Sequence, residues 1–203
     1  NQPTGSVLSQ KESDELVRLT AQKNILLVVD EAYHQFHSES FVKFVERDAR
    51  HVIVTRSFSK GYGISGLRLG FAIAHPQVIN QLSKTRGLHE VNAVAIKIGR
   101  AVLNDKEHLA QYLTQINEGR KALESSIEAS DIRMPKCCAN FQLLKFSGNL
   151  QPLDITKKLR QKGYLVRGNL GHPSLSDCIR VTLASPETML SFGKNLLKTL
   201  NLP

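Results

Sequence analysis

Residues 57–70 read SFSKGYGISGLRLG, and this stretch decides how the rest of the chain is interpreted. It places Lys60 between the hydroxyl side chains of Ser57 and Ser59, and Arg68 follows inside a glycine-rich turn. A lysine becomes nucleophilic when desolvation or a neighbouring cation favours its neutral amine. Serine hydroxyls and accessible backbone N–H groups suit a phosphate. The stretch therefore predicts a reactive amine beside a phosphate site, although in isolation an ordinary surface loop with a solvated lysine fits it equally well.

Two apolar runs precede this stretch and end where a ligand site needs polar residues. Residues 24–30, NILLVVD, predict a buried parallel strand with Asp30 at its carboxyl end, and Tyr33 follows in the next turn. Residues 51–56, HVIVTR, predict a second strand that leads directly into the lysine stretch. Ligands of open α/β sheets bind at the carboxyl ends of strands. Asp30 and Lys60 are therefore expected to share one crevice.

Four motifs in this order resemble a known family. They read NQPTG at residues 1–5, DEAY at 30–33, SFSK at 57–60 and GLRLG at 66–70. Together they are similar to the signature of fold-type I pyridoxal-phosphate enzymes, in the class I/II aminotransferase group. The tail, with Arg167 and Arg180 in VR and PSLSDCIRVT, looks closest to histidinol-phosphate aminotransferases. Threonine-phosphate decarboxylases share the same signature, so the resemblance leaves amino transfer and decarboxylation both open.

The resemblance implies a role for each matched residue near the reactive amine. Lys60 would bind pyridoxal 5′-phosphate covalently and shuttle a proton during the reaction. Asp30 would pair with the pyridine nitrogen of the cofactor and keep the ring protonated. Asn1 and Tyr33 would hydrogen-bond its phenolic oxygen.

The resemblance also implies two groups of anion contacts. Ser57, Ser59 and Arg68 would hold the phosphate of the cofactor, because a planar guanidinium can meet two phosphate oxygens at once. Arg180 would receive the carboxylate or phosphate of the substrate, with Arg167 as a second contact. The expected small-molecule partners are an amino donor and a 2-oxo acid.

Several of these residues have a structural alternative. Asp30 can cap a helix after the strand, and Tyr33 can be a buried aromatic side chain with a satisfied hydroxyl. Arg167 and Arg180 can be solvated surface charges. Glu31 is expected to point away from Asp30, since neighbouring strand residues face opposite sides.

The pattern of elements predicts an α/β part followed by a small α+β domain. The resemblance implies that the α/β part is the carboxyl-terminal part of a fold-type I pyridoxal-phosphate-dependent transferase, with a partial large-domain sheet and its helices. Residues 1–104 are expected to form the large-domain part with a connecting helix, and residues 105–203 the small domain, with a boundary near Asn104–Asp105. The chain begins inside a motif from the middle of the family sequence. The amino-terminal half of the family is therefore expected to be absent, and this chain alone to be inactive.

Capping signals and periodicity predict the remaining elements. In chain order they are a helix from the capping box of Ser9 and Glu12 to Gln22, a strand at 69–74, a helical region at 76–103 interrupted at 87–90, a helix at 109–127, strands at 139–146, 164–167 and 178–183, and a helix from Pro186 to Leu200.

Composition argues against other classes of protein. The net charge is +9, but the basic residues are scattered and lack an aromatic platform, so nucleic acid is not an expected partner. The three cysteines have no zinc spacing, and no metal is predicted. No signal segment or membrane span is found in the sequence, which favours a cytoplasmic protein without a membrane partner. The intact enzyme is expected to be a homodimer; the remaining alternative is an inactive fragment that only folds or associates.

Overall fold

The computed structural model describes residues 2–148 and 150–201 of the chain. Its contacts divide the chain into two compact units. The first unit is Val7–Ala110, and the second unit joins Asn1–Ser6 to Gln111–Pro203. The domain boundary that the sequence predicts near Asn104–Asp105 lies shortly before this division.

The first unit contains both helices and strands. Its elements are α1 (Gln10–Gln22), β1 (Leu27–Asp30), α2 (Val42–Glu46), β2 (Val52–Ser57), β3 (Gly70–Ala74), α3 (Pro76–Ser83) and α4 (Ala93–Asn104), with 3₁₀ turns at His34–Phe36 and Ser65–Leu67. The predicted interruption of the helical region is confirmed by the gap between α3 and α4. Helix α2 is too short to show a helical period and is not predicted from the sequence.

Helix α1 begins at the predicted capping box. The Ser9 hydroxyl accepts from the Glu12 N–H at 3.3 Å, and the Glu12 carboxylate accepts from the Ser9 N–H at 2.8 Å. The helix buries Val17 in a core that also contains Phe44 of α2 and Val54 of β2. Helices α1 and α2 therefore contribute to one core on a face of the sheet.

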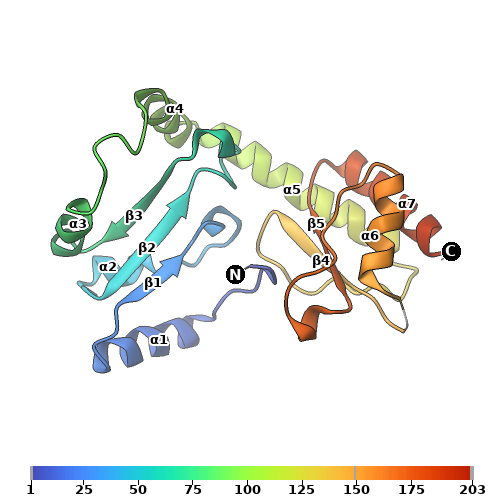
Figure 1. The fold of residues 1–203 in the computed structure, drawn as a ribbon, viewed down its shortest axis with the longest axis horizontal. Helices are drawn as coiled ribbons and strands as arrows, with labels where there is room; N and C mark the ends of the chain where they lie inside the picture. The colour runs from blue at the N-terminus through green and yellow to red at the C-terminus, as the bar shows by residue number, and fades with distance from the viewer. Residues whose placement is uncertain (1, 149, 202–203) are drawn as a thin grey trace. The chain divides into compact units, whose positions relative to one another are not determined.

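The sheet of the first unit has the order β1-β2-β3 (Figure 1). Strands β1 and β2 are parallel, with Asp30 opposite Thr55, which confirms the predicted parallel arrangement. Strand β3 returns antiparallel and pairs Gly70 with Ser57. Because parallel strands end at the same edge, the residues after β1 and after β2 emerge side by side.

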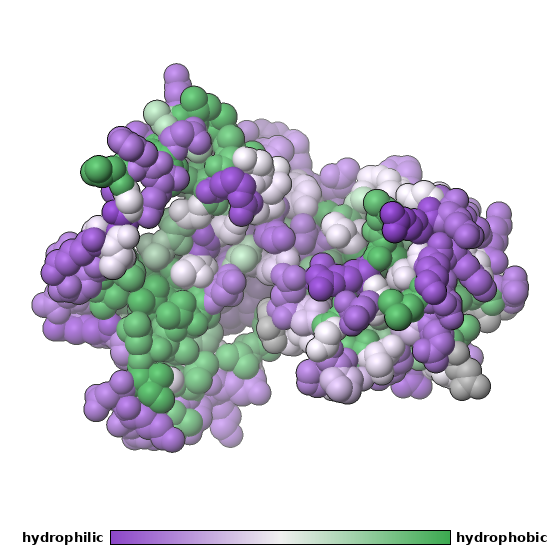
Figure 2. Space-filling view, in the orientation of Figure 1, coloured by the Kyte–Doolittle hydropathy of each residue, from purple (hydrophilic) through white to green (hydrophobic). Residues whose placement is uncertain are grey.

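Strand β1 is shorter and more exposed than the sequence predicts. It begins at Leu27 because Asn24 has a left-handed backbone (φ 53°) that belongs to the turn after α1. Val28 is 57% exposed, so the prediction of a buried strand over residues 24–30 is wrong. In the described sheet β1 pairs with β2 alone, and Val28 faces away from the core that holds Leu27. Figure 2 shows apolar surface over the part of this unit where Figure 1 draws β1.

The second unit is an α+β arrangement around a two-stranded antiparallel sheet. Its elements are the larger part of α5 (Lys106–Ile127), β4 (Phe141–Lys145), α6 (Pro152–Gln161), β5 (Cys178–Thr182) and α7 (Pro186–Leu200), with a 3₁₀ turn at Pro173–Leu175. Its core contains fully buried side chains from each of these helices and strands, among them Leu123, Leu144, Leu159, Ile179 and Leu196.

The strand predicted at residues 164–167 does not form. Arg167 alone pairs with β5, through one isolated bridge to Arg180. The next residue, Gly168, lies against α6, where an added Cβ would be 2.8 Å from Thr156 Cγ2 and 3.0 Å from the Pro152 carbonyl oxygen. The segment is thus held against the start of α6, and within the described residues its pairing with β5 does not extend beyond the bridge at Arg167.

Candidate functional site

Asp30 begins the first turn of the candidate site. Its Oδ1 accepts a hydrogen bond from the Ala32 N–H at 2.9 Å. The carboxylate therefore caps a turn and does not cap a helix. The predicted alternative of a helix cap is therefore wrong. Asp30 is exposed, and among the described residues it forms no salt bridge. A carboxylate at the end of β1 is thus available to a positively charged ring nitrogen.

The second turn follows β2 and carries Lys60. The Ser57 hydroxyl accepts from the Ser59 N–H at 3.0 Å. Phe58 and Tyr62 are buried, with ring centroids 5.1 Å apart, and they anchor the turn in the first unit. The polar residues of this turn are half-buried: Ser57, Ser59 and Lys60. Two hydroxyls and an amine therefore lie at the edge of the sheet.

Lys60 and Tyr33 bring the two turns together. The Lys60 Nζ lies 5.3 Å from the centroid of the Tyr33 ring, within the range of a cation–π contact. The two residues come from segments that follow neighbouring parallel strands. Their proximity supports the expectation that the residues after β1 and β2 share one crevice.

Two further contacts near the strand ends are not predicted from the sequence. The Gln35 side chain packs on Gly61: a Cβ added to Gly61 would lie 2.7–2.8 Å from three Gln35 side-chain atoms. Glu31 forms a salt bridge with Arg56, with an N–O distance of 3.0 Å. The glycine directly after Lys60 is the one signal in the sequence for the first contact, because it suggests a close approach.

Arg68 returns the chain toward the lysine turn. It adopts a left-handed backbone (φ 53°), and its Nη1 donates to the Ser65 carbonyl oxygen at 3.0 Å. Gly70, two residues on, pairs with Ser57. In the described part of the chain, no hydrogen bond or salt bridge joins Arg68 to either serine or to Lys60, and its guanidinium is exposed.

Arg167 and Arg180 lie in the second unit, where they face each other across the isolated bridge. Each donates its backbone N–H to the carbonyl oxygen of the other, at 3.1 and 2.8 Å. Directly paired residues project their side chains from the same face of a sheet. Arg180 is half-buried with its guanidinium carbon 5.1 Å from the Phe141 ring, and Arg167 is exposed with its Nε donating to the Asn169 carbonyl. Within the described ranges neither arginine has a carboxylate partner, an arrangement that suits an anion.

Asn1, the remaining predicted cofactor contact, lies outside the described residues.

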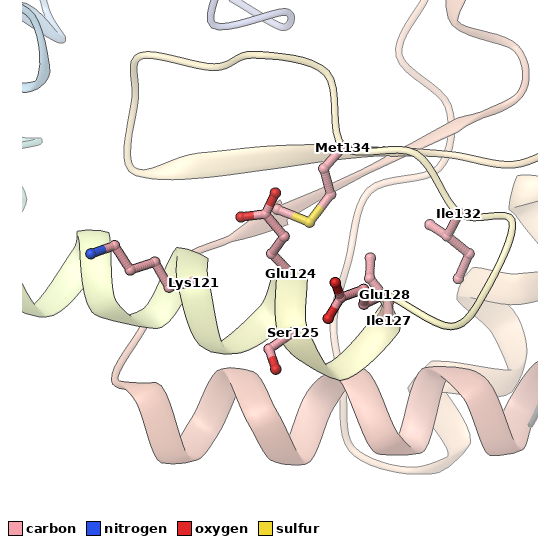
Figure 3. A pocket seen from close by; sticks show the side chains of 7 residues that line it. All are labelled: Lys121, Glu124, Ser125, Ile127, Glu128, Ile132 and Met134. Atoms are coloured by element: carbon pink, nitrogen blue, oxygen red, sulfur yellow. The ribbon is translucent and has the colours of Figure 1, made fainter.

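A cavity of about 450 Å³ lies elsewhere, between α5 and the segment that precedes β4. Figure 3 shows Glu124 of α5 extending toward Met134, with Glu128 directly after the end of the helix. None of the predicted site residues lines it. The first unit therefore offers the two turns as one group of candidate residues, and the second unit offers the arginine pair as another.

Within residues 2–148 and 150–201, no three His, Cys, Asp or Glu side chains are grouped so as to hold a metal ion. None of the described helices is long and apolar enough to span a membrane.

A family model and individual relatives both match this chain, and both are aminotransferases. A sequence model described as "Aminotransferase class I and II" matches residues 1–192. Histidinol-phosphate aminotransferase 1 of Nostoc sp. is 34% identical over 188 residues, which cover 92% of this chain and 51% of that protein. The chain spans about half the length of the curated relatives it matches.

Solved structures share the architecture. Histidinol-phosphate aminotransferase from Sinorhizobium meliloti, in complex with pyridoxal-5′-phosphate, matches with a TM-score of 0.82 at 23% identity, covering 98% of this chain and 56% of that one. L-threonine-O-3-phosphate decarboxylase from Porphyromonas gingivalis matches with a TM-score of 0.81 at 19% identity, covering 99% and 62%. The expected fold class, part of a fold-type I α/β domain plus a small α+β domain, is confirmed.

We expect Gly61→Ala to loosen the contact between the two turns, because the added methyl group would collide with Gln35. The free energy of unfolding, measured by urea denaturation, should fall by about 1–3 kcal/mol, as in other overpacked sites. Gln35→Ala in the same background should restore most of the loss. Gly66→Ala is the matched control, because nothing lies within 4 Å of a Cβ added there. Equal effects of the two glycine substitutions would contradict the packing of Gln35 on Gly61.

Proposed function

This chain belongs to the class I and II aminotransferase family, and we propose that it carries the cofactor-binding lysine and the substrate arginines of a pyridoxal-phosphate-dependent aminotransferase of the histidinol-phosphate type. The observation that carries the proposal is the contact of the Lys60 amine with the Tyr33 ring, at the sheet edge where Asp30 ends β1. An amine, a phenol and a carboxylate are thereby gathered from two turns. These three groups are complementary to a pyridine aldehyde that carries a phenolic oxygen: the amine suits its aldehyde, the phenol its phenolic oxygen and the carboxylate its ring nitrogen.

The residues of the first unit fit pyridoxal 5′-phosphate. Its aldehyde carbon requires an amine, which Lys60 supplies. Its pyridine nitrogen requires an anion, and the Asp30 carboxylate has one oxygen engaged by the turn and no salt bridge among the described residues. Its phosphate requires donors, and the lysine turn offers the two serine hydroxyls, with the exposed guanidinium of Arg68 on the returning chain. When bound, the cofactor supplies an electron sink for charge that develops on the substrate α-carbon.

Each residue of the two turns then has a defined task. The negative charge of Asp30 holds a proton on the ring nitrogen, and the Ala32 N–H keeps that carboxylate oriented. The Tyr33 hydroxyl would donate a hydrogen bond to the phenolic oxygen of the cofactor. The Lys60 Nζ would hold the cofactor and, as a free amine, would accept the proton from the α-carbon of the amino donor.

The arginine pair of the second unit is proposed to bind the anionic end of the substrates. Two guanidinium groups on one face suit a phosphate or a carboxylate, because each can form paired N–H···O bonds. A phosphorylated amino donor and a 2-oxo acid acceptor both carry such a group. Assembly as a homodimer and a cytoplasmic location stay predictions from the sequence.

A decarboxylase of a phosphorylated amino acid is the second candidate. The observation in its favour is the nearly equal structural similarity to a threonine-phosphate decarboxylase and to a histidinol-phosphate aminotransferase. The two reactions differ in their products and in their need for an acceptor. Release of carbon dioxide without a 2-oxo acid would identify the decarboxylase.

We expect Lys60 to be the site of covalent attachment in the protein at its full natural length. After loading with pyridoxal phosphate, borohydride reduction and peptide mapping should find the cofactor on Lys60. Lys60→Ala should abolish both the label and the visible absorbance of the bound cofactor. Lys84→Ala, at an exposed lysine of the same unit, should change neither. A label on another lysine in the wild type would refute the assignment.

We expect Arg180→Ala to raise the KM for the amino donor by at least about 10-fold, because a charge-assisted hydrogen bond to the substrate anion is lost. Arg180→Lys should fall between alanine and wild type, since it keeps the charge without the planar fork. The visible absorbance of the bound cofactor should be unchanged in both variants. Arg160→Ala is the control, at an exposed arginine of α6. A KM as low as that of the control would exclude Arg180 from the substrate site.

A further inference from the structure

Glu31 and Arg56 form a partly desolvated ion pair directly behind the candidate site. Glu31 follows Asp30 in the chain, and Arg56 precedes Ser57. The Arg56 Nη2 and Nε donate to Glu31 Oε2 at 3.0 and 3.2 Å. The exposed fractions of the two side chains are 8% for Glu31 and 18% for Arg56. Each member of the pair is thus adjacent in sequence to a predicted cofactor contact.

The carboxylate of Glu31 is fully engaged. Its Oε1 accepts from the Phe41 N–H at 2.6 Å, and the Ser40 hydroxyl lies 3.0 and 2.9 Å from its two oxygens. The Arg56 Nη2 also donates to the Ser40 hydroxyl at 2.9 Å. A buried charge is tolerated when it is paired and its remaining lone pairs are satisfied. The network therefore joins the ends of β1 and β2 to the start of α2.

The backbone of Glu31 adds a second connection to β2. Its N–H donates to the Thr55 carbonyl oxygen at 2.8 Å, which extends the β1–β2 pairing one residue beyond Asp30. Successive residues of an extended strand face opposite sides. Holding the Glu31 side chain on one side consequently holds the Asp30 side chain on the other.

We propose that Glu31 is a positioning residue of the active site: through Arg56, Ser40 and the Phe41 N–H it fixes the Asp30 carboxylate toward the pyridine nitrogen of the cofactor. The inference rests on the proposed function. Glu31 touches neither cofactor nor substrate in this scheme and acts only through Asp30. Removal of the Glu31 charge should therefore lower kcat only in a protein whose Asp30 is charged.

His34 provides a report on the network that does not depend on catalysis. Its Nδ1 lies 3.2 Å from the Glu31 carbonyl oxygen. Burial lowers the pKa of His34, and the Arg56 charge lowers it further, whereas the charge of Glu31 opposes the shift. Glu31→Gln should accordingly lower this pKa, and Arg56→Gln should raise it. Titration of the His34 ring signals by NMR measures both changes in the protein without substrate.

The decisive experiment is a double-mutant cycle between Glu31 and Asp30 in the protein at its full natural length, at saturating pyridoxal phosphate. Glu31→Gln alone should lower kcat by about 10- to 100-fold, the order of magnitude lost when a residue that orients a metal ligand is replaced. The KM for the amino donor should be little changed. In the Asp30→Asn background, Glu31→Gln should have no further effect on kcat, because the group it positions has lost its charge.

Controls separate this inference from the proposed function. Glu46→Gln, at an exposed glutamate of α2, should leave kcat and the His34 pKa unchanged. If Glu31→Gln does not fold, Ser40→Ala removes one hydroxyl of the network and should lower kcat several-fold in the wild type but not in Asp30→Asn. Equal reductions in both backgrounds would overturn the positioning role and leave the aminotransferase proposal intact. A wild-type protein that neither binds pyridoxal phosphate nor transfers an amino group would overturn both.

Discussion

The parallel pairing of β1 with β2 is the constraint on which the candidate site depends. It aligns Asp30 with Thr55, so the two strands end at one edge and their following turns start side by side. Two contacts then follow: Lys60 with the Tyr33 ring between the turns, and Glu31 with Arg56 at the end of β2. A shift of one residue in this register would turn the Asp30 side chain to the opposite face of the sheet and separate these groups.

Much of the fold follows from local signals in the sequence. The capping box at Ser9 and the serine–proline start of α7 mark helix ends through hydrogen bonds between near neighbours, so they can be predicted from short stretches. Helix α6 also carries readable signals that the sequence analysis missed, with Pro152 in its first turn and Ile155 and Leu159 buried at helical spacing. The exposure of Val28 has no such signal, because burial of a strand depends on which elements lie beside it.

The candidate site was predictable as a set of residue types and not as a set of contacts. The order of the motifs and the strand ends that precede them indicate which polar residues gather at the sheet edge. The partners of Glu31 are distant in sequence, and nothing local to Ser40 or Arg56 points to them. The same holds for Arg167 and Arg180: the segment beside this pair packs against α6 at Gly168, and the apparent strand pattern does not reveal that contact.

The central claim is that the turns after β1 and β2 form one binding site for pyridoxal phosphate. A crystal structure of the cofactor-loaded protein at its full natural length tests it most directly. The account predicts continuous density from the Lys60 Nζ to the cofactor, with an Asp30 carboxylate oxygen about 2.7–3.2 Å from the pyridine nitrogen. Cofactor bound away from these two turns, or a different acidic residue at the ring nitrogen, would contradict it.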